Sequence, residues 1–160
     1  MSITLTSAPP ALAGKWLWLF PATYLVHLTE EYWGGEGFYR WLAKFAGNGL
    51  TAGQFLSINA LFLIIMIVSM LVILRGPAWH WLLSGYGTLV VINGVLHVIG
   101  TMVTASYSPG LVSGVLLWIP LGIYTLRRCR RTLPPAEFWF GFSAGVVMHA
   151  AVSLIALTIG

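Results

Sequence analysis

The sequence predicts an all-α membrane protein, a polytopic bundle of about five transmembrane helices plus one interfacial amphipathic helix. Of its 160 residues, 58% are hydrophobic and 8% are charged, whereas a soluble domain contains roughly 25% charged residues. The mean hydropathy is +0.87. A soluble domain of this length still exposes about a third of the surface of its unfolded chain. Lipid must therefore solvate much of this chain, which we expect to form a single domain over 1–160.

Five apolar segments are long enough to cross a ~30 Å hydrocarbon core, which takes about 20 helical residues. They cover 15–33, 52–74, 79–104, 109–126 and 138–158. Glycine, proline and arginine separate them, at Gly34-Gly35, Arg75-Gly76-Pro77, Ser106 to Gly110, and the basic run before Pro134-Pro135. Each break would stop a helix or leave charge at its end, so these five segments are the predicted spans.

The segment 37–47, between the first two spans, has helical periodicity of its own. Its apolar residues Phe38, Trp41, Leu42 and Phe45 fall at i, i+3, i+4 and i+7, and Arg40 and Lys44 fall on the other face. This pattern predicts an amphipathic helix lying in the membrane interface. A plain linker and a lid over a site remain open as its role.

The basic residues predict the orientation, because cytoplasmic segments carry an excess of Lys and Arg. Lys15, Arg75 and the Arg127–Arg131 run fall on one side, and Arg40 and Lys44 on the other. We therefore expect a multi-pass protein with a cytoplasmic N-terminus and the C-terminus on the opposite side. A polar, flexible segment is expected over 1–14 and a cytoplasmic basic loop over 127–136.

The same distribution bears on partners. Charge gathered at helix ends, without a broad basic face, argues against nucleic-acid binding. The lipid bilayer is the expected partner, and a homo-oligomeric state is left open. Cys129, the only cysteine, cannot form an intramolecular disulfide.

Three ionisable residues lie near the end of the first span. At about 100° per residue, Glu30 falls roughly 60° to one side of His27 and Glu31 roughly 40° to the other. A charge near the bilayer centre costs several kcal/mol. We therefore expect all three side chains to face the bundle interior and to find partners there.

Later spans offer such partners. Asn93 and His97 are four residues apart in the third span, and His149 lies in the fifth. A rise of ~1.5 Å per residue places His27 about 18 Å, Asn93 about 21 Å, His97 about 27 Å and His149 about 17 Å from the cytoplasmic boundary. These depths overlap in the outer half of the bilayer and predict one shared site.

Imidazole and carboxylate groups are standard ligands for zinc and non-haem iron. The predicted ligands of one or two such divalent ions are His27, Glu30, Glu31, His97 and His149. The predicted catalytic groups are Glu30, Glu31 and Asn93, since a carboxylate that stays off the metal would act as a general base on its water. Trp33, Asn59 and Tyr107 are expected to line the substrate pocket.

The run His27-Leu28-Thr29-Glu30-Glu31 resembles the HXXEE-motif family of small membrane proteins, which is named after this pattern. The resemblance continues through Asn93, His97, the turn from Tyr107 to Gly110, and His149. It supports the location of the site more than a particular reaction.

These observations predict a membrane-embedded, metal-dependent enzyme that acts on a lipid or other hydrophobic substrate, with hydrolysis slightly preferred over oxidation. One alternative is a metal-free isomerase or cyclase, in which a His–Glu pair moves protons on an isoprenoid or sterol-like substrate. Another is a transporter or binding protein that uses the cluster as a relay, although the chain has no inverted repeat for alternating access. A structural assembly factor with a polar core is the third.

Overall fold

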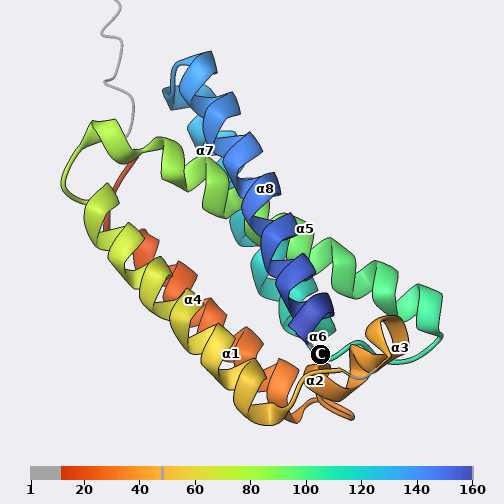
Figure 1. Ribbon diagram of the computed structural model, residues 1–160. Coiled ribbons are helices and arrows are strands. Elements are labelled where there is room, and N and C mark those ends of the chain that lie inside the picture. Colours follow the sequence, from red (N-terminus) through yellow and green to blue (C-terminus); the bar gives the residue numbers. More distant parts are fainter. Residues whose placement is uncertain (1–11, 48, 160) are drawn as a thin grey trace, which may run out of the picture.

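The computed structural model describes residues 12–47 and 49–159, and every regular element among them is helical (Figure 1). The chain forms, in order, η1 (Lys15–Trp18), α1 (Leu19–Trp33), α2 (Phe38–Trp41), α3 (Ala43–Ala46), α4 (Ala52–Ile73), η2 (Pro77–Trp79), α5 (Trp81–Thr104), α6 (Leu111–Ser113), the π-helical η3 (Gly114–Trp118), α7 (Ile119–Thr132) and α8 (Pro135–Ile159). This confirms the all-α prediction for the described residues.

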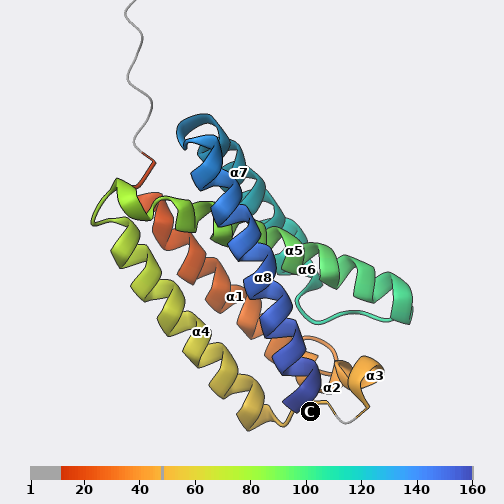
Figure 2. The same cartoon turned by 45° about the horizontal axis from the view of Figure 1, so that its top comes forward.

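The long helices form two groups (Figures 1 and 2). Helix α1 packs against α4, and α5 packs against both α7 and α8. The segment α6–η3 contacts α5 and α1 and so joins the groups. The start of α1 and the α7–α8 connection lie at one end, and α2, α3 and the end of α8 lie at the other.

Glycines fix α5 against its neighbours. A Cβ on Gly122 of α7 would lie 2.6 Å from the carbonyl oxygen of Gly87, and one on Gly145 of α8 would lie 2.4 Å from that of Gly85. Small residues of this kind let helix backbones approach closely in membranes. Helix α5 is therefore held on two sides by direct backbone contact, which gives the residues it carries a fixed position.

Three helical stretches are long and apolar enough to cross a membrane: Ala52–Ile73, Pro77–Thr104 and Pro135–Ile159. They correspond to the second, third and fifth predicted spans. The other two predicted spans do not meet these criteria as single helices. Helix α1 has 15 residues, or about 22 Å, and the fourth segment is divided by the π-helical turn η3.

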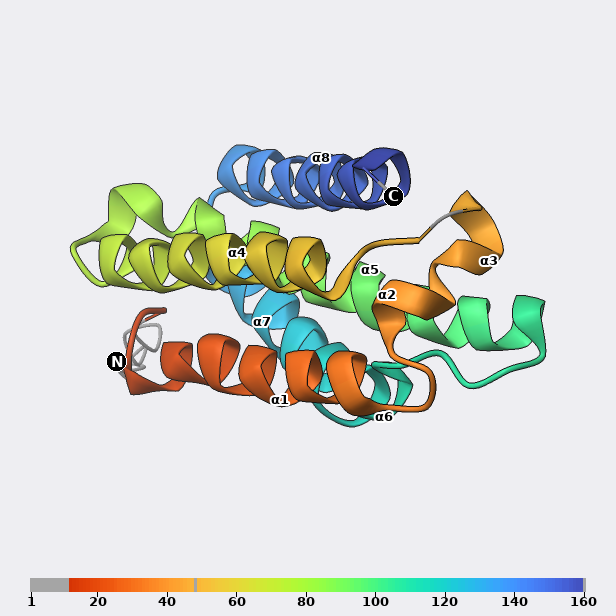
Figure 3. The ribbon, with the colours of Figure 1, turned by 60° about the horizontal axis from the view of Figure 1, so that its bottom comes forward.

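The segment after α1 differs from the predicted amphipathic helix. Residues 37–47 form two four-residue helices, α2 and α3, separated at Leu42. Trp41 is buried against α5, where a Cβ on Gly100 would lie 2.4 Å from its Cη2 atom. Figure 3 shows this end of the molecule, where α2 and α3 lie beside the C-terminal part of α5. The segment thus caps the bundle, and its place in the membrane interface stays a prediction.

Two other boundaries need correction. Helix α7 continues to Thr132, so the arginines expected in a loop over 127–136 are helical. Arginine is a good helix former, so the basic run does not interrupt the helix. The connection between α7 and α8 therefore consists of residues 133 and 134 alone. Of the N-terminal segment expected over 1–14, 1–11 lie outside the described residues, and Leu12 is buried in the core.

Candidate metal centre

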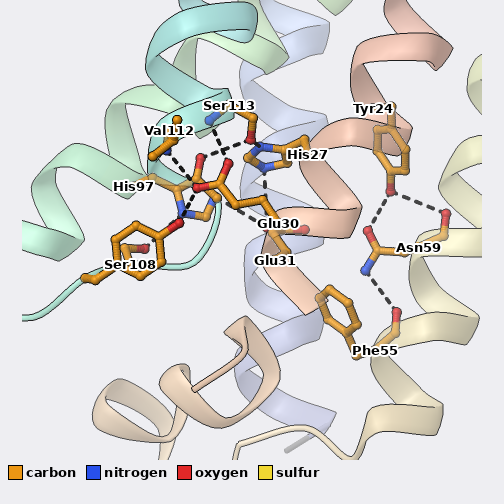
Figure 4. A network of polar contacts seen from close by, with 12 residues as sticks. Tyr24, His27, Glu30, Glu31, Phe55, Asn59, His97, Ser108, Val112 and Ser113 are labelled. Atoms are coloured by element: carbon orange, nitrogen blue, oxygen red, sulfur yellow. Dashed lines mark hydrogen bonds and ion pairs between the residues drawn. The ribbon is translucent and has the colours of Figure 1, made fainter. Parts of the chain in front are cut away.

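Two helices from different groups supply the centre. His27 and Glu31 lie one turn apart on α1, and His97 lies on the neighbouring face of α5. Their side chains point toward one another (Figure 4). The three residues are buried, with exposed fractions of 1%, 7% and 3%. Buried groups of this kind need partners, because an isolated charge in a medium of low polarity is very costly.

The distances within the centre suit a metal ion. The Nε2 atoms of His27 and His97 each lie 3.4 Å from Oε1 of Glu31. One donor atom from each of the three residues lies within 4.8 Å of the other two. Ligand atoms on a tetrahedral ion with bonds of ~2.0–2.1 Å are roughly 3.4 Å apart. The three buried residues are therefore close enough to bind one ion.

Two serines orient the imidazoles. Nδ1 of His27 lies 2.7 Å from Oγ of Ser113, and Nδ1 of His97 lies 2.9 Å from Oγ of Ser108. Nε2 of His27 is buried without a hydrogen-bond partner and lies on the side of Glu31. When Nδ1 carries the proton and donates to Ser113, the lone pair of the imidazole is on Nε2. That tautomer is the one that binds a metal through Nε2, with the other nitrogen held by a hydrogen bond.

The turn between α5 and α6 covers both rings. Gly110 has φ of 100°, and a Cβ there would lie 2.6 Å from Cε1 of His97 and 2.8 Å from Cε1 of His27. Residues with a side chain rarely adopt this backbone conformation. Both the conformation and the lack of space require glycine at the point where the turn meets the centre.

Glu30 has a different set of contacts from Glu31. Its carboxylate accepts the backbone N–H groups of Val112 at 2.8 Å and Ser113 at 2.6 Å, and the hydroxyl of Tyr107. A carboxylate is favourable at a helix N-terminus, where N–H groups lack partners. Glu30 thus caps the helix that begins at Leu111 and lies outside the group of three donors, although the motif had predicted it as a ligand.

Tyr107 supports this cap as a neutral donor. Burial, and then its hydrogen bond to Glu30, raise the pKa of the Tyr107 hydroxyl to about 12. The phenol therefore keeps its proton at physiological pH. The turn that carries Ser108 and Gly110 is in this way fixed to the end of α1.

A cavity of about 370 Å³ lies beside the centre, and most of its wall is apolar. Glu31 and His97 form part of the wall, together with Asn93 and His149. Nδ1 of His149 lies 3.2 Å from Oγ of Ser153. His149, which the sequence predicted as a ligand, is outside the group of three donors but faces the same cavity.

Of the three residues predicted to line the substrate pocket, the structure places one in the wall of the cavity. Asn59 lines the cavity, where its Oδ1 accepts the hydroxyl of Tyr24 at 2.6 Å. Trp33 is 74% exposed, and Tyr107 lies beside Glu30. Neither belongs to the described residues that line the cavity.

Sequence reasoning did not identify three residues at the centre. Ser108 and Ser113 hold the imidazoles, and Trp118 stacks on His27 with ring centroids 3.8 Å apart. The two serines lie on either side of the Pro109-Gly110 turn. Their position next to this helix break was the feature of the sequence that could have indicated their role. Nothing in the sequence indicated that Trp118 faces His27.

A comparison with known proteins identifies the family of this chain. A family model described as a protein of unknown function with an HXXEE motif matches residues 18–125. The match includes the three clustered donors and both serines, and it ends before His149. No curated protein and no solved structure matches the chain. Because the match covers well over half of the sequence, the chain belongs to the HXXEE-motif family, whose function is unknown.

Proposed function

We propose that this protein is a membrane-embedded, metal-dependent enzyme that acts on a lipid or other hydrophobic substrate, with hydrolysis preferred over oxidation. One observation carries the proposal: two members of a buried donor set of two histidines and one glutamate, Glu31 and His97, form part of the wall of an apolar cavity. Three protein ligands with one position left for water or substrate are typical of catalytic zinc, whereas structural zinc has four protein ligands.

The donors favour one ion, because they converge on one oxygen of Glu31. Bound there, zinc would polarise a substrate carbonyl and lower the pKa of a water molecule. His149 is the residue we assign to proton transfer, since it faces the cavity but is not among the three donors. Its Nδ1 contacts Ser153, which leaves Nε2 free to exchange a proton with a substrate.

Oxidation is the second candidate. Two histidines and one carboxylate are also the ligands of non-haem iron oxygenases, and the donor set here has that composition. We rank hydrolysis first because His149 offers a group for proton transfer outside the donor set. The identity of the ion in the purified protein separates the two candidates.

We also propose five membrane crossings with the N-terminus in the cytoplasm. The turn η1 and helix α1 together extend about 30 Å, which suits a hydrocarbon core of ~30 Å. Counted to Leu126, before the first arginine of the run, α6, η3 and α7 follow one another over about 24 Å, a shorter crossing that thinning of the bilayer would accommodate. The start of α1 lies at the end opposite to the end of α8, as an odd number of crossings requires.

The test is metal analysis combined with an activity assay. The protein is purified in detergent without chelator, and its metal content is measured by mass spectrometry. Fluorogenic acyl esters and acyl amides with long chains are then assayed before and after chelation. We expect about one equivalent of metal and hydrolysis that chelation and Glu31→Gln abolish.

His80→Ala is the matched control, because His80 lies at the other end of α5. It should retain both metal and activity. Hydrolysis that continues in protein shown to be free of metal would contradict the metal-dependent mechanism. Absence of metal in the wild-type protein, together with failure to take up zinc or iron, would defeat the proposal.

A further inference from the structure

We infer that the cavity binds one uncharged, single-chain amphiphile that arrives from the lipid, with its polar head beside Glu31 and His97. The inference names the substrate class of the enzyme proposed above, and it rests on that proposal. It depends on the shape of the cavity, the residues at its rim, the charges on its wall and two polar groups without partners.

The cavity is suited to a hydrocarbon chain. Its volume of about 370 Å³ falls within the roughly 300–1,000 Å³ typical of small-molecule sites. Phe62 and Met66 of α4, Leu89 of α5 and Val152 of α8 are among its apolar lining residues. The wall thus runs between the two helix groups and offers a chain apolar contacts from three helices.

The rim is apolar as well. Ile65 of α4, Leu96 of α5 and Leu157 of α8 line the cavity and are 40%, 43% and 42% exposed. Phe45 of α3 adds a further exposed apolar side chain at 49%. Residues of α4, α5 and α8 at these positions would face lipid in a membrane. A ligand that passes this rim therefore comes from the hydrocarbon phase.

The charge of the wall disfavours an ionic head. Among the described residues that line the cavity, Glu31 is the only Asp, Glu, Lys or Arg. Proteins recognise phosphate and carboxylate groups with Arg and Lys. Among the described residues, no Arg or Lys lines the cavity. A cationic head would find Glu31 already flanked by two imidazoles. An uncharged head is the one that fits.

Two polar groups on the wall indicate which hydrogen-bonding groups the head of the ligand must carry. Oδ1 of Asn93 and Nε1 of Trp118 are buried without hydrogen-bond partners, and both residues line the cavity. Asn93 lies one turn before His97 on α5, and Trp118 is stacked on His27. An unpaired buried group costs ~1–3 kcal/mol. A hydroxyl or amide head supplies both the donor that Asn93 lacks and the acceptor that Trp118 lacks.

Direct binding of three probes with the same chain tests the inference. Tritiated hexadecanol, hexadecyl sulfate and hexadecyltrimethylammonium are titrated onto the full chain in lipid nanodiscs, after the metal has been removed with chelator. We expect saturable binding of hexadecanol at one site, with both charged probes at least about 10-fold weaker. Equal or tighter binding of either charged probe would overturn the uncharged head.

Two Val→Trp variants on α8 locate the site. Val152→Trp fills the cavity and should abolish hexadecanol binding, whereas Val147→Trp, at an exposed position outside the lining, should leave it unchanged. Asn93→Leu should weaken binding about 10-fold without loss of thermal stability, since it removes a buried group that has no partner. Hexadecanol binding that survives Val152→Trp would show that the probe binds elsewhere.

The use of metal-free protein keeps this result separate from the proposed reaction. Hexadecanol binding to a protein that never holds metal would defeat the proposed enzyme and leave the ligand class standing. A metal-dependent hydrolase that binds no uncharged amphiphile in its cavity would defeat the inference alone.

Discussion

Glu30 acts on His27 through Ser113. Oε2 of Glu30 accepts the backbone N–H of Ser113 at 2.6 Å, and Oγ of the same serine lies 2.7 Å from Nδ1 of His27. The two adjacent glutamates of the motif thus have separate tasks. Glu31 supplies a donor atom to the centre, and Glu30 holds the segment that orients one of the histidines.

This division predicts different effects for the two glutamates. Glu30→Ala removes the acceptor of two backbone N–H groups at a helix start and should lower the free energy of unfolding by about 2 kcal/mol. Glu31→Gln should abolish metal binding while the metal-free protein unfolds close to the wild-type temperature. Thermal unfolding in detergent and metal analysis measure both. Equal loss of stability in the two variants would contradict the assignment.

The serines should control metal affinity. Ser108→Ala and Ser113→Ala each remove the hydrogen-bond partner of one imidazole Nδ1. Loss of such a partner typically weakens metal binding by about 10–100-fold, and we expect that range in competition titrations with a zinc chelator. Ser143→Ala, at an exposed position on α8, is the control. Unchanged zinc affinity in both variants would mean that the serines do not orient the ligands.

Gly110 should tolerate no side chain. Gly110→Ala would place a Cβ within 2.6 Å of His97 and would also strain the backbone by about 1–2 kcal/mol. Gly47→Ala is a matched control, because Gly47 also has positive φ, at 79°, and its Cβ would meet nothing within 4 Å. We expect both variants to lose some stability, but only Gly110→Ala to lose the metal. Retention of metal by Gly110→Ala would show that the turn can withdraw from the rings.

The histidines should fall into two classes. His27→Ala and His97→Ala remove a member of the donor set and should eliminate both metal and activity. His149→Ala should retain the metal and lower kcat by about 100-fold or more, as expected for a lost proton-transfer group. Metal analysis and hydrolysis rates on the same preparations make the comparison. Loss of metal in His149→Ala would return this residue to the ligand set predicted from the sequence.

The hydropathy of the sequence predicted the positions of the long helices well. The length of an apolar segment can be read from the local sequence and does not depend on contacts with other parts of the chain. The second predicted span, 52–74, corresponds to Ala52–Ile73, and the fifth, 138–158, lies within Pro135–Ile159. Helix ends were less accurate where the signal was charge. Arg127 to Arg131 were read as a loop, although arginines are good helix formers and can extend past the membrane within the same helix.

The candidate site was predicted in part, for a physical reason that the glutamates illustrate. Helical periodicity placed Glu30 and Glu31 on one face of α1, but it cannot tell which neighbouring element meets each of them. Glu30 meets the N-terminus of α6, and Glu31 meets His97 of α5. His149 shows the same limit, because its depth along the span was calculable and its lateral distance from His27 was not.

Topology can be tested by cysteine labelling without removing the native thiol. Cys129 is fully buried, and burial raises the pKa of its thiol to about 12, so it should not react with maleimides at neutral pH. We expect Arg128→Cys to be labelled from the cytoplasmic side and Lys44→Cys from the opposite side. Labelling of both from one side would contradict five crossings. The unmodified chain, which should stay unlabelled, is the control.

The two helix groups meet at the centre, and this gives a bound ion a mechanical effect. His27 and Glu31 belong to the α1–α4 pair, and His97 belongs to α5, which is held by glycine contacts to α7 and α8. An ion that binds all three would act as a cross-link between the halves of the molecule, at one side of the cavity that separates them. Without the ion, the α6–η3 segment would still join the halves through its contacts with α1 and α5, so the metal would stiffen the cavity without being needed to form it.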